Sequence, residues 1–246
     1  MFPMRWKCGC SYDGTDYSGW QTQDGPLSIQ QVVEECLSEI FKKDTKAIGS
    51  GRTDAGVHAM EQVFHFDFEW KHDPGSLVEA MRSLLPDTVT PLFVQKVEDD
   101  FHARFSAVSK WYQYRIYLGQ ATALENRYSW SLYGDLALEA MAKATSLLEG
   151  THDFGAFAAN RGIEYKTTVR KMFRSEMLQE KDFLLLNFQA DGFMYKMVRS
   201  FAGTLANVGL RRLSLDAFHE LLKSAERTPM VFVAPAKGLF LKKVFY

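Results

Sequence analysis

One loop of the sequence surrounds a single carboxylate with glycines. The string GSGRTDAGVHA spans residues 49–59, and Arg52 lies two positions before Asp54. The three glycines are Gly49, Gly51 and Gly56. Glycine permits backbone shapes and close approaches that other residues forbid, so this loop can present one side chain to a bulky ligand. An aspartate in a loop more often caps a turn, and the residues alone leave both interpretations open.

Other common site chemistries find little support around Asp54. The loop lacks the G-x-x-x-x-G-K-[ST] phosphate loop, and it lacks G-x-G-x-x-G before a helix. A second carboxylate is not close in sequence, so a hydrolase with paired acids gains no local support. A hydrolase with Asp54 as a lone nucleophile stays an alternative. The histidines show no metal-ligand spacing, and they are His58, His65, His72, His102, His152 and His219.

Regular elements flank the loop on both sides. Alternating apolar residues predict strands over 5–12 and 64–70. Ser28 with Gln31 forms a capping-box pattern, and the apolar residues that follow keep helical spacing as far as Phe41. Further elements are short strands at 46–50 and 92–97, and a helix that Ser76 and Glu79 open and Pro86 stops.

The second half repeats this kind of pattern. Strands are predicted at 109–118, 170–179, 183–190 and 239–246, and helices at 136–148, 193–208 and 215–224. We therefore expect an α+β fold of two similar α/β halves, 1–106 and 107–246. The halves are expected to share a central, mainly antiparallel mixed sheet flanked by helices, with the active-site cleft between them.

Charge does not by itself identify a partner. Of 246 residues 46% are hydrophobic, enough for a substantial core, and the formal net charge is −1, unlike a strongly basic nucleic-acid binder. Five basic residues lie between Arg161 and Arg174, where Glu164 is the one acid. Four more, without any acid, lie within 192–215. From charge alone, ordinary solvated faces are the preferred interpretation.

The cysteines and the hydropathy profile indicate the compartment. The three cysteines are an odd number and form no CxxC pair, so neither a disulfide framework nor a zinc site is expected. The amino terminus lacks the apolar core of a signal peptide, and no run of about 18 apolar residues occurs. We expect a cytoplasmic protein without a membrane span.

The string GRTDAGVHA resembles the active-site motif of the TruA family of pseudouridine synthases. Other matching strings follow in the family's order, so the resemblance extends from residue 12 to residue 246. They are YDGTDYSGWQ at 12–21, FHARFSA at 101–107, THDFGAF at 151–157, TTVRK at 167–171, GFMYKMVRSFAGTL at 192–205 and APAKGLFL at 234–241. Two positions depart from the family pattern. Arg82 stands where an asparagine is usual, and 230–233 replaces an Ala-Gly then Thr string.

The resemblance implies a role for particular residues. Asp54 matches the essential aspartate, and Arg199 matches its charged partner. Tyr112 matches the residue that stacks on the uracil and lies where the C5 proton leaves. Arg52 matches a residue that fills the gap left by the flipped nucleotide or contacts phosphate, and Leu239 and Leu241 match apolar residues beneath the uracil. From pattern alone, strand core is the first interpretation of Tyr112, either leucine also suits strand core, and the arginines suit exposed positions.

The family isomerises uridines to pseudouridine at positions 38, 39 and 40 of tRNA anticodon stem-loops, as a homodimer that holds the tRNA across both subunits. The reaction breaks the bond between uracil N1 and ribose C1′ and joins C5 to C1′, so nothing is added or lost. Neither a cofactor nor a metal is therefore expected. The alternatives are a tRNA-binding or tRNA-folding protein of the same fold, and a synthase with a different set of tRNA uridines.

Overall fold

The chain folds into two compact units. The computed structural model describes residues 4–159, 162 and 165–246, so Arg161 and Glu164 of the first basic stretch lie outside the described residues. The N-terminal unit combines Met1–Val108 with Phe240–Tyr246, and the C-terminal unit is Ser109–Leu239. The division expected from the sequence, 1–106 and 107–246, thus differs at the carboxyl end. The last strand pairs with a strand of the first unit, which no local pattern encodes.

The N-terminal unit is built on a mixed sheet with strand order β4-β1-β3-β10. Its strands are β1 (Met4–Tyr12), β2 (Ile48–Gly49), β3 (His58–Phe68), β4 (Val89–Val97) and β10 (Leu239–Phe245). β1 is antiparallel to both β3 and β4, and β2 is antiparallel to β3. β10 is parallel to β3, with Phe240 opposite His58 and Leu241 opposite Ala59.

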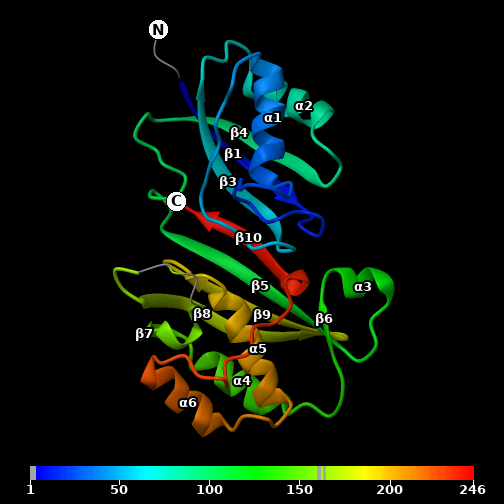
Figure 1. Ribbon diagram of the computed structural model, residues 1–246, viewed down its shortest axis with the longest axis vertical. Helices are drawn as coiled ribbons and strands as arrows, with labels where there is room; N and C mark the ends of the chain where they lie inside the picture. Colours follow the sequence, from blue (N-terminus) through cyan, green and yellow to red (C-terminus); the bar gives the residue numbers. More distant parts are fainter. Residues whose placement is uncertain (1–3, 160–161, 163–164) are drawn as a thin grey trace. The chain divides into compact units, whose positions relative to one another are not determined.

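Two helices cover one face of this sheet, α1 (Ile29–Phe41) and α2 (Pro74–Leu84) (Figure 1). Only half of the predicted capping box forms, because the Ser28 side chain accepts the Gln31 N–H while the Gln31 amide bonds Glu35 instead. The cap of α2 is Asp73 rather than Ser76. Pro74 occupies the first helical position, where its missing N–H costs nothing, so the helix begins before Ser76.

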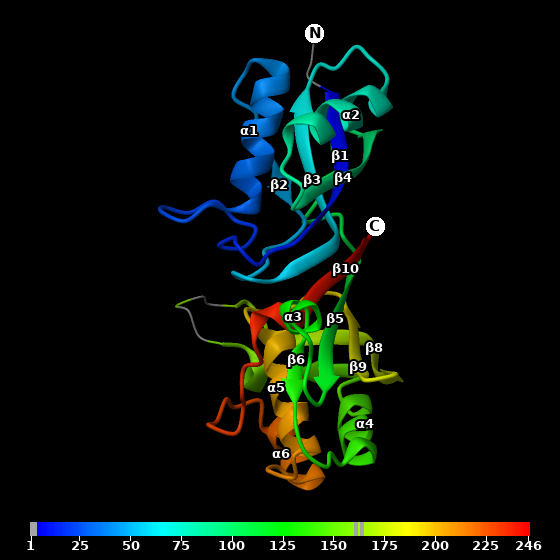
Figure 2. The ribbon, with the colours of Figure 1, turned by 90° about the vertical axis from the view of Figure 1, so that its right-hand side faces the viewer.

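The C-terminal unit has strand order β5-β9-β8-β7, antiparallel throughout, with β6 parallel to β5. The strands are β5 (Ser109–Leu118), β6 (Trp130–Leu132), β7 (Gly150–Asp153), β8 (Val169–Glu180) and β9 (Phe183–Ala190). The helices are α3 (Ala123–Arg127), α4 (Leu138–Ser146), α5 (Met197–Gly209) and α6 (Leu215–Ser224), with short 3-10 turns η1 (Gly155–Phe157) and η2 (Ala236–Gly238). Figure 2 shows α4, α5 and α6 gathered beside the strands of this unit. The α+β class is confirmed.

Helix α5 is the central helix of the C-terminal unit. Its residues are buried on almost every side, and Phe201 is in contact with a cluster of phenylalanines. The cluster members are Phe154, Phe157, Phe188 and Phe218. Glycine at residue 203 lets a neighbouring main-chain segment approach this helix closely. α5 begins at Met197 rather than at 193, because Lys196 adopts a left-handed conformation with φ 57°.

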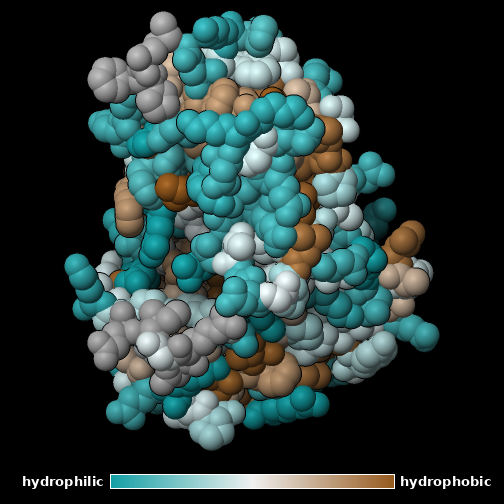
Figure 3. All heavy atoms as spheres, turned by 45° about the horizontal axis from the view of Figure 1, so that its top comes forward, coloured by the Kyte–Doolittle hydropathy of each residue, from teal (hydrophilic) through white to brown (hydrophobic). Residues whose placement is uncertain are grey.

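The surface seen in Figure 3 is mostly hydrophilic, and hydrophobic residues reach it in separate places. The three cysteines are free thiols inside the N-terminal unit, where burial raises the pKa of the Cys36 thiol to about 12. In the described part of the chain, each helix is too short or too polar to cross a bilayer.

His65 is a buried titratable group of the N-terminal sheet. It is 2% exposed, and its Nδ1 accepts the Ala103 N–H at 3.1 Å. Burial, together with the positive charges of Arg5 and His102, lowers the pKa of His65 to about 4. The neutral ring therefore belongs to the folded state, whereas an unfolded chain protonates it near pH 6.5.

We expect the folding stability to fall as the pH is lowered from 6.5 to about 4. In that range the unfolded chain binds a proton that folded His65 does not, and a pKa unit corresponds to about 1.4 kcal/mol. Urea unfolding at a series of pH values measures this slope. His65→Gln should flatten it, and His219→Gln, on an exposed position of α6, should not. An unchanged slope in His65→Gln would rule out His65 as its source.

Candidate active site

Asp54 lies in the turn that joins β2 to β3. These strands pair antiparallel, with Ile48 opposite His65 and Gly49 opposite Phe64, so the loop closes a hairpin. Asp54 is partly exposed, and its carbonyl accepts the Val57 N–H at 3.1 Å. The motif is therefore a loop that leads into the largely buried strand β3 and holds one carboxylate at its turn.

The segment 12–21 fixes the main chain on both sides of Asp54. The Trp20 N–H donates to the Thr53 carbonyl at 3.2 Å, and the Gly56 N–H donates to the Tyr17 carbonyl at 3.3 Å. The Tyr12 hydroxyl also lies 2.9 Å from the Thr53 hydroxyl. Two strings that the sequence analysis matched separately thus form one structural unit around Asp54.

The contact between the segment 12–21 and the motif depends on glycines with positive φ. Gly56 has φ 76°, and Gly19 has φ 97°. A Cβ on Gly19 would lie 2.3 Å from the Thr53 carbonyl oxygen, far inside van der Waals contact. Glycine is thus required at residue 19 for both its conformation and its close approach to the motif.

We expect Gly19→Ala to destabilise the folded protein by roughly 1–3 kcal/mol, because it combines backbone strain with a steric overlap. Gly25→Ala is the matched control, since Gly25 has φ 104° but nothing within 4 Å of the added Cβ. It should cost roughly 1 kcal/mol, the part due to conformation alone. Urea unfolding compares the two. Equal losses would show that the contact with Thr53 is unimportant.

Gln62, which was not among the predicted site residues, supports the motif from inside β3. Its side chain is fully buried, accepts the Ser50 hydroxyl at 2.7 Å and donates to the Gly51 carbonyl at 3.0 Å. A signal was present, because Gln62 continues the same alternation as Phe64 and therefore places a polar group on a core face. Buried polar groups of this kind are hydrogen-bonded, and here the partners are the residues that begin the motif.

His58, the motif histidine, holds the turn that follows β1. Its Nδ1 accepts the Gly14 N–H at 3.1 Å, and it lies 3.1 Å from Asp13 Oδ1. That carboxylate oxygen already accepts two hydrogen bonds from Thr15. His58 thus joins the turn after β1 to the first residue of β3. The ring stacks on Phe240 with centroids 4.7 Å apart.

The other predicted residues of the N-terminal unit lie close to the motif. Arg52 is exposed, and its Nε donates to Gln21 Oε1 at 3.2 Å. Leu241 is fully buried on β10, opposite Ala59 at the end of the motif. Arg52 and Asp54 thus lie on one loop, and Leu241 lies beside the residue that ends the motif.

Tyr112 lies on β5 of the C-terminal unit. It is 7% exposed, and its ring meets the edge of Phe193 at 5.0 Å and 79°. Tyr114 follows on the same face and is fully buried, with its hydroxyl donated to the Pro235 carbonyl at 2.8 Å. Burial raises the pKa of Tyr114, so this residue has the character of core.

Arg199 lies in the first turn of α5. It is partly exposed, and its Nε donates to the Ala234 carbonyl at 2.8 Å. The positive charge of Arg199 acts on Tyr114 and opposes the rise in that tyrosine's pKa. Leu239, also of the C-terminal unit, is 6% exposed at the start of β10. Arg199 and Tyr114 thus lie in one neighbourhood of this unit, at the segment that leads to Leu239.

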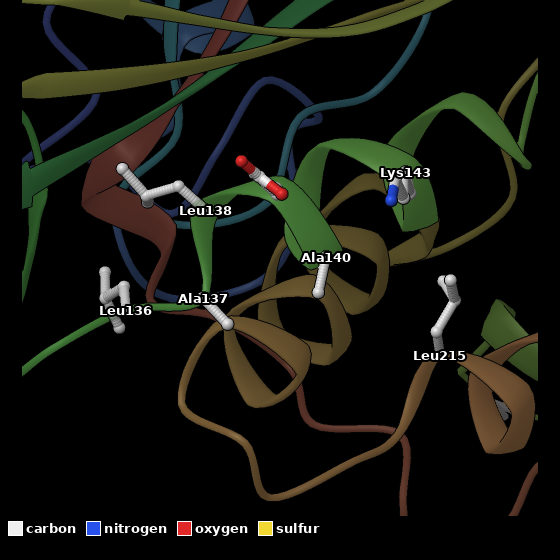
Figure 4. A pocket seen from close by; sticks show the side chains of 7 residues that line it. Leu136, Ala137, Leu138, Ala140, Lys143 and Leu215 are labelled. Carbon is white, nitrogen blue, oxygen red and sulfur yellow. The ribbon is translucent and has the colours of Figure 1, made fainter.

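A pocket of about 530 Å³ lies elsewhere, at the beginnings of α4 and α6 (Figure 4). Its walls are mainly leucine and alanine side chains, and none of the predicted site residues lines it. The lining residues are Leu136, Ala137, Leu138, Glu139, Ala140, Lys143 and Leu215. Within the described ranges, no three His, Cys, Asp or Glu side chains gather closely enough to hold a metal ion.

Comparisons with known proteins identify the same family as the motif does. The family model described as tRNA pseudouridine synthase matches residues 10–106 and 144–246. The chain therefore belongs to the tRNA pseudouridine synthase family. A relative named tRNA pseudouridine synthase A from Thermoanaerobacter sp. (strain X514) is 39% identical over 96% of both chains.

A second relative and a solved structure were also matched. A protein named tRNA pseudouridine synthase A 1 from Protochlamydia amoebophila (strain UWE25) is 39% identical, over 98% of this chain and 96% of the relative. Among solved structures, a Cbf5-Nop10-Gar1 complex matches at 15% identity and a TM-score of 0.36, over 82% of this chain and 44% of that chain. A superposition at this level adds nothing to the assignment.

Proposed function

We propose that this protein isomerises uridine to pseudouridine at positions 38, 39 and 40 of tRNA anticodon stem-loops. The observation that carries the proposal is the glycine-framed loop with Asp54, held on both sides by the segment 12–21, in a chain of the tRNA pseudouridine synthase family. The relatives' printed name, tRNA pseudouridine synthase A, supports tRNA as the substrate.

Each predicted residue has a role in this proposal. Asp54 supplies the carboxylate that acts beside the sugar, and Arg199 is its charged partner, since a planar guanidinium suits a carboxylate. Tyr112 holds the detached uracil against its ring and lies where the C5 proton leaves. Arg52 enters the space of the flipped nucleotide or contacts phosphate, and Leu239 and Leu241 pack beneath the base. The protein needs neither a cofactor nor a metal for this rearrangement.

We further propose that the protein works in the cytoplasm as a homodimer. The weak net charge suits this arrangement, because basic residues of two subunits together provide more positive surface for RNA than one subunit has. Exposed members of the two basic stretches are Lys166, Lys171, Arg174, Arg211 and Arg212. Two of them are already paired, Arg174 with Glu176 and Arg211 with Asp135.

The proposal is tested with unmodified tRNA transcripts labelled with tritium at uracil C5. Isomerisation releases that hydrogen to water, so tritium release and a mapped pseudouridine are expected from transcripts with uridine at 38, 39 or 40. Transcripts with cytidine at all three positions are the control. Binding without any tritium release would identify a tRNA-binding protein, release from other positions a different set of uridines, and free uracil a hydrolase.

A further inference from the structure

The segment from Arg227 to Pro235, here called the 227–235 segment, runs from the end of α6 to the turn before β10. It lies beside α5 in both views of the ribbon (Figure 1, Figure 2). At its first end, Arg227 Nη1 donates to the Ser200 hydroxyl at 3.2 Å and to the Ala156 carbonyl at 3.3 Å. Ser200 is fully buried and directly follows Arg199.

The far end of the segment is joined to Arg199 itself. The Ala234 N–H donates to the Arg199 carbonyl at 3.0 Å, and Arg199 Nε donates to the Ala234 carbonyl at 2.8 Å. One residue further on, the Pro235 carbonyl accepts the Tyr114 hydroxyl at 2.8 Å. Ala234 therefore binds both the main chain and the side chain of Arg199, and β5 holds the next residue in place.

The middle of the segment touches α5 without any side chain between them. A Cβ on Gly203 would lie 2.2 Å from the Phe232 carbonyl oxygen and 2.9 Å from the Ala234 nitrogen. Gly203 follows Arg199 by one helical turn, so both residues share a face of α5. The ring of Phe232 lies 5.9 Å from that of Trp130 on β6. This close approach is what lets Ala234 reach Arg199.

We propose that the 227–235 segment sets the orientation of the Arg199 guanidinium for the reaction, and that Gly203 is the positioning residue which allows it. The proposal rests on the role of Arg199 in the proposed function. With Nε donated to Ala234, the plane of the guanidinium is fixed, and a carboxylate is directed to the Nη edge. An arginine held in advance does not have to be ordered when the substrate binds, and small misplacements of reacting groups reduce rates strongly.

The test compares the same substitution at two buried glycines of α5. In Gly203→Ala the added Cβ meets a main-chain carbonyl, so the segment must move and the Arg199 contact with Ala234 is lost. In Gly209→Ala it meets Met141 Sδ at 3.1 Å, the end of a flexible side chain. Single-turnover pseudouridine formation at saturating enzyme, tRNA affinity and the melting temperature are measured for both.

We expect Gly203→Ala to slow the single-turnover step by roughly ten- to a hundredfold, with tRNA affinity retained, since it moves a positioned group without removing it. Gly209→Ala should keep the wild-type rate. In an Arg199→Lys background, Gly203→Ala should add little further loss, because the group through which it acts is already gone. A wild-type rate in folded Gly203→Ala, or a full additive loss with Arg199→Lys, would overturn the proposal.

A second readout is independent of activity. The Arg199 Nε–H signal, assigned in NMR spectra by its loss in Arg199→Lys, should exchange slowly in the wild type and fast in Gly203→Ala. If Gly203→Ala does not fold, Tyr114→Phe takes its place, because it removes the hydroxyl that holds Pro235. Fast exchange already in the wild type, or unchanged exchange in the variant, contradicts the positioning role. A wild type that forms no pseudouridine would contradict the proposed function. Slow exchange of the Nε–H in that case would still support the contact of the 227–235 segment with Arg199.

Discussion

Asp54→Asn is expected to lower the rate of pseudouridine formation by roughly a thousandfold or more, the scale seen when an essential catalytic group is removed. Asparagine has nearly the same shape as aspartate, so the turn and its hydrogen bonds with the segment 12–21 should persist. What is lost is the negative charge and the nucleophilic or basic oxygen. The affinity for tRNA should therefore stay close to that of the wild type, as should the melting temperature.

The measurement is tritium release from C5-labelled tRNA under single-turnover conditions, together with tRNA binding. Asp24→Asn is the control, because Asp24 is exposed in the same N-terminal unit and carries the same change in charge. It should behave as wild type. If Asp54→Asn kept more than about a tenth of the wild-type rate, Asp54 would not be the essential carboxylate.

The elements that sequence patterns predicted best are those with a complete periodic face. β5 and α6 begin and end at the predicted residues, 109–118 and 215–224. Helix α6 buries Phe218, Leu221 and Leu222 at helical spacing, and the side chain of Ser214 caps its N-terminus. Local propensity and tertiary packing agree in such segments, and therefore the pattern alone is sufficient.

Differences arise where contacts distant in sequence decide the structure. β3 begins at His58, six residues before the alternating phenylalanines, because pairing with β1 and β10 extends it into the motif. The three-residue strand β6 exists through its parallel pairing with β5 and has too few residues for a periodic signal. The start of α5 depends on one residue, Lys196, and its left-handed conformation is not predicted by any sequence pattern.

The candidate site shows the same division. The motif and its aspartate were identified from a string of residues, and the structure puts that string in a turn. The alternation of β3 marks Gln62 as a buried polar residue, but its partners, like those of Gly19 and the Tyr12 hydroxyl, are known only from contacts in the folded chain. The departure from the family pattern at 230–233 is also clearer in the structure, since Phe232 lies against Gly203, next to the contact between Ala234 and Arg199.

Tyr112→Phe is the second variant with a large expected effect. It separates the two roles proposed for Tyr112, which are holding the uracil and taking part in the loss of its C5 proton. Phenylalanine keeps the ring that meets Phe193 and the stacking face, worth roughly 1–3 kcal/mol per base, but lacks the hydroxyl. If that hydroxyl takes part in the proton transfer, tritium release should fall by roughly a hundredfold or more, the usual contribution of a positioned acid or base. The affinity for tRNA should remain.

Tyr117→Phe on the same strand is the matched control, since it removes a hydroxyl from a partly exposed tyrosine and should leave the rate unchanged. Tyr112→Leu goes further, because it removes the ring as well, and we expect it to weaken the hold on the uracil in addition to slowing the reaction. Wild-type tritium release from Tyr112→Phe, with a loss in Tyr112→Leu, would limit Tyr112 to stacking and assign the C5 proton to another group. A full rate in both variants would make Tyr112 a residue of the strand core.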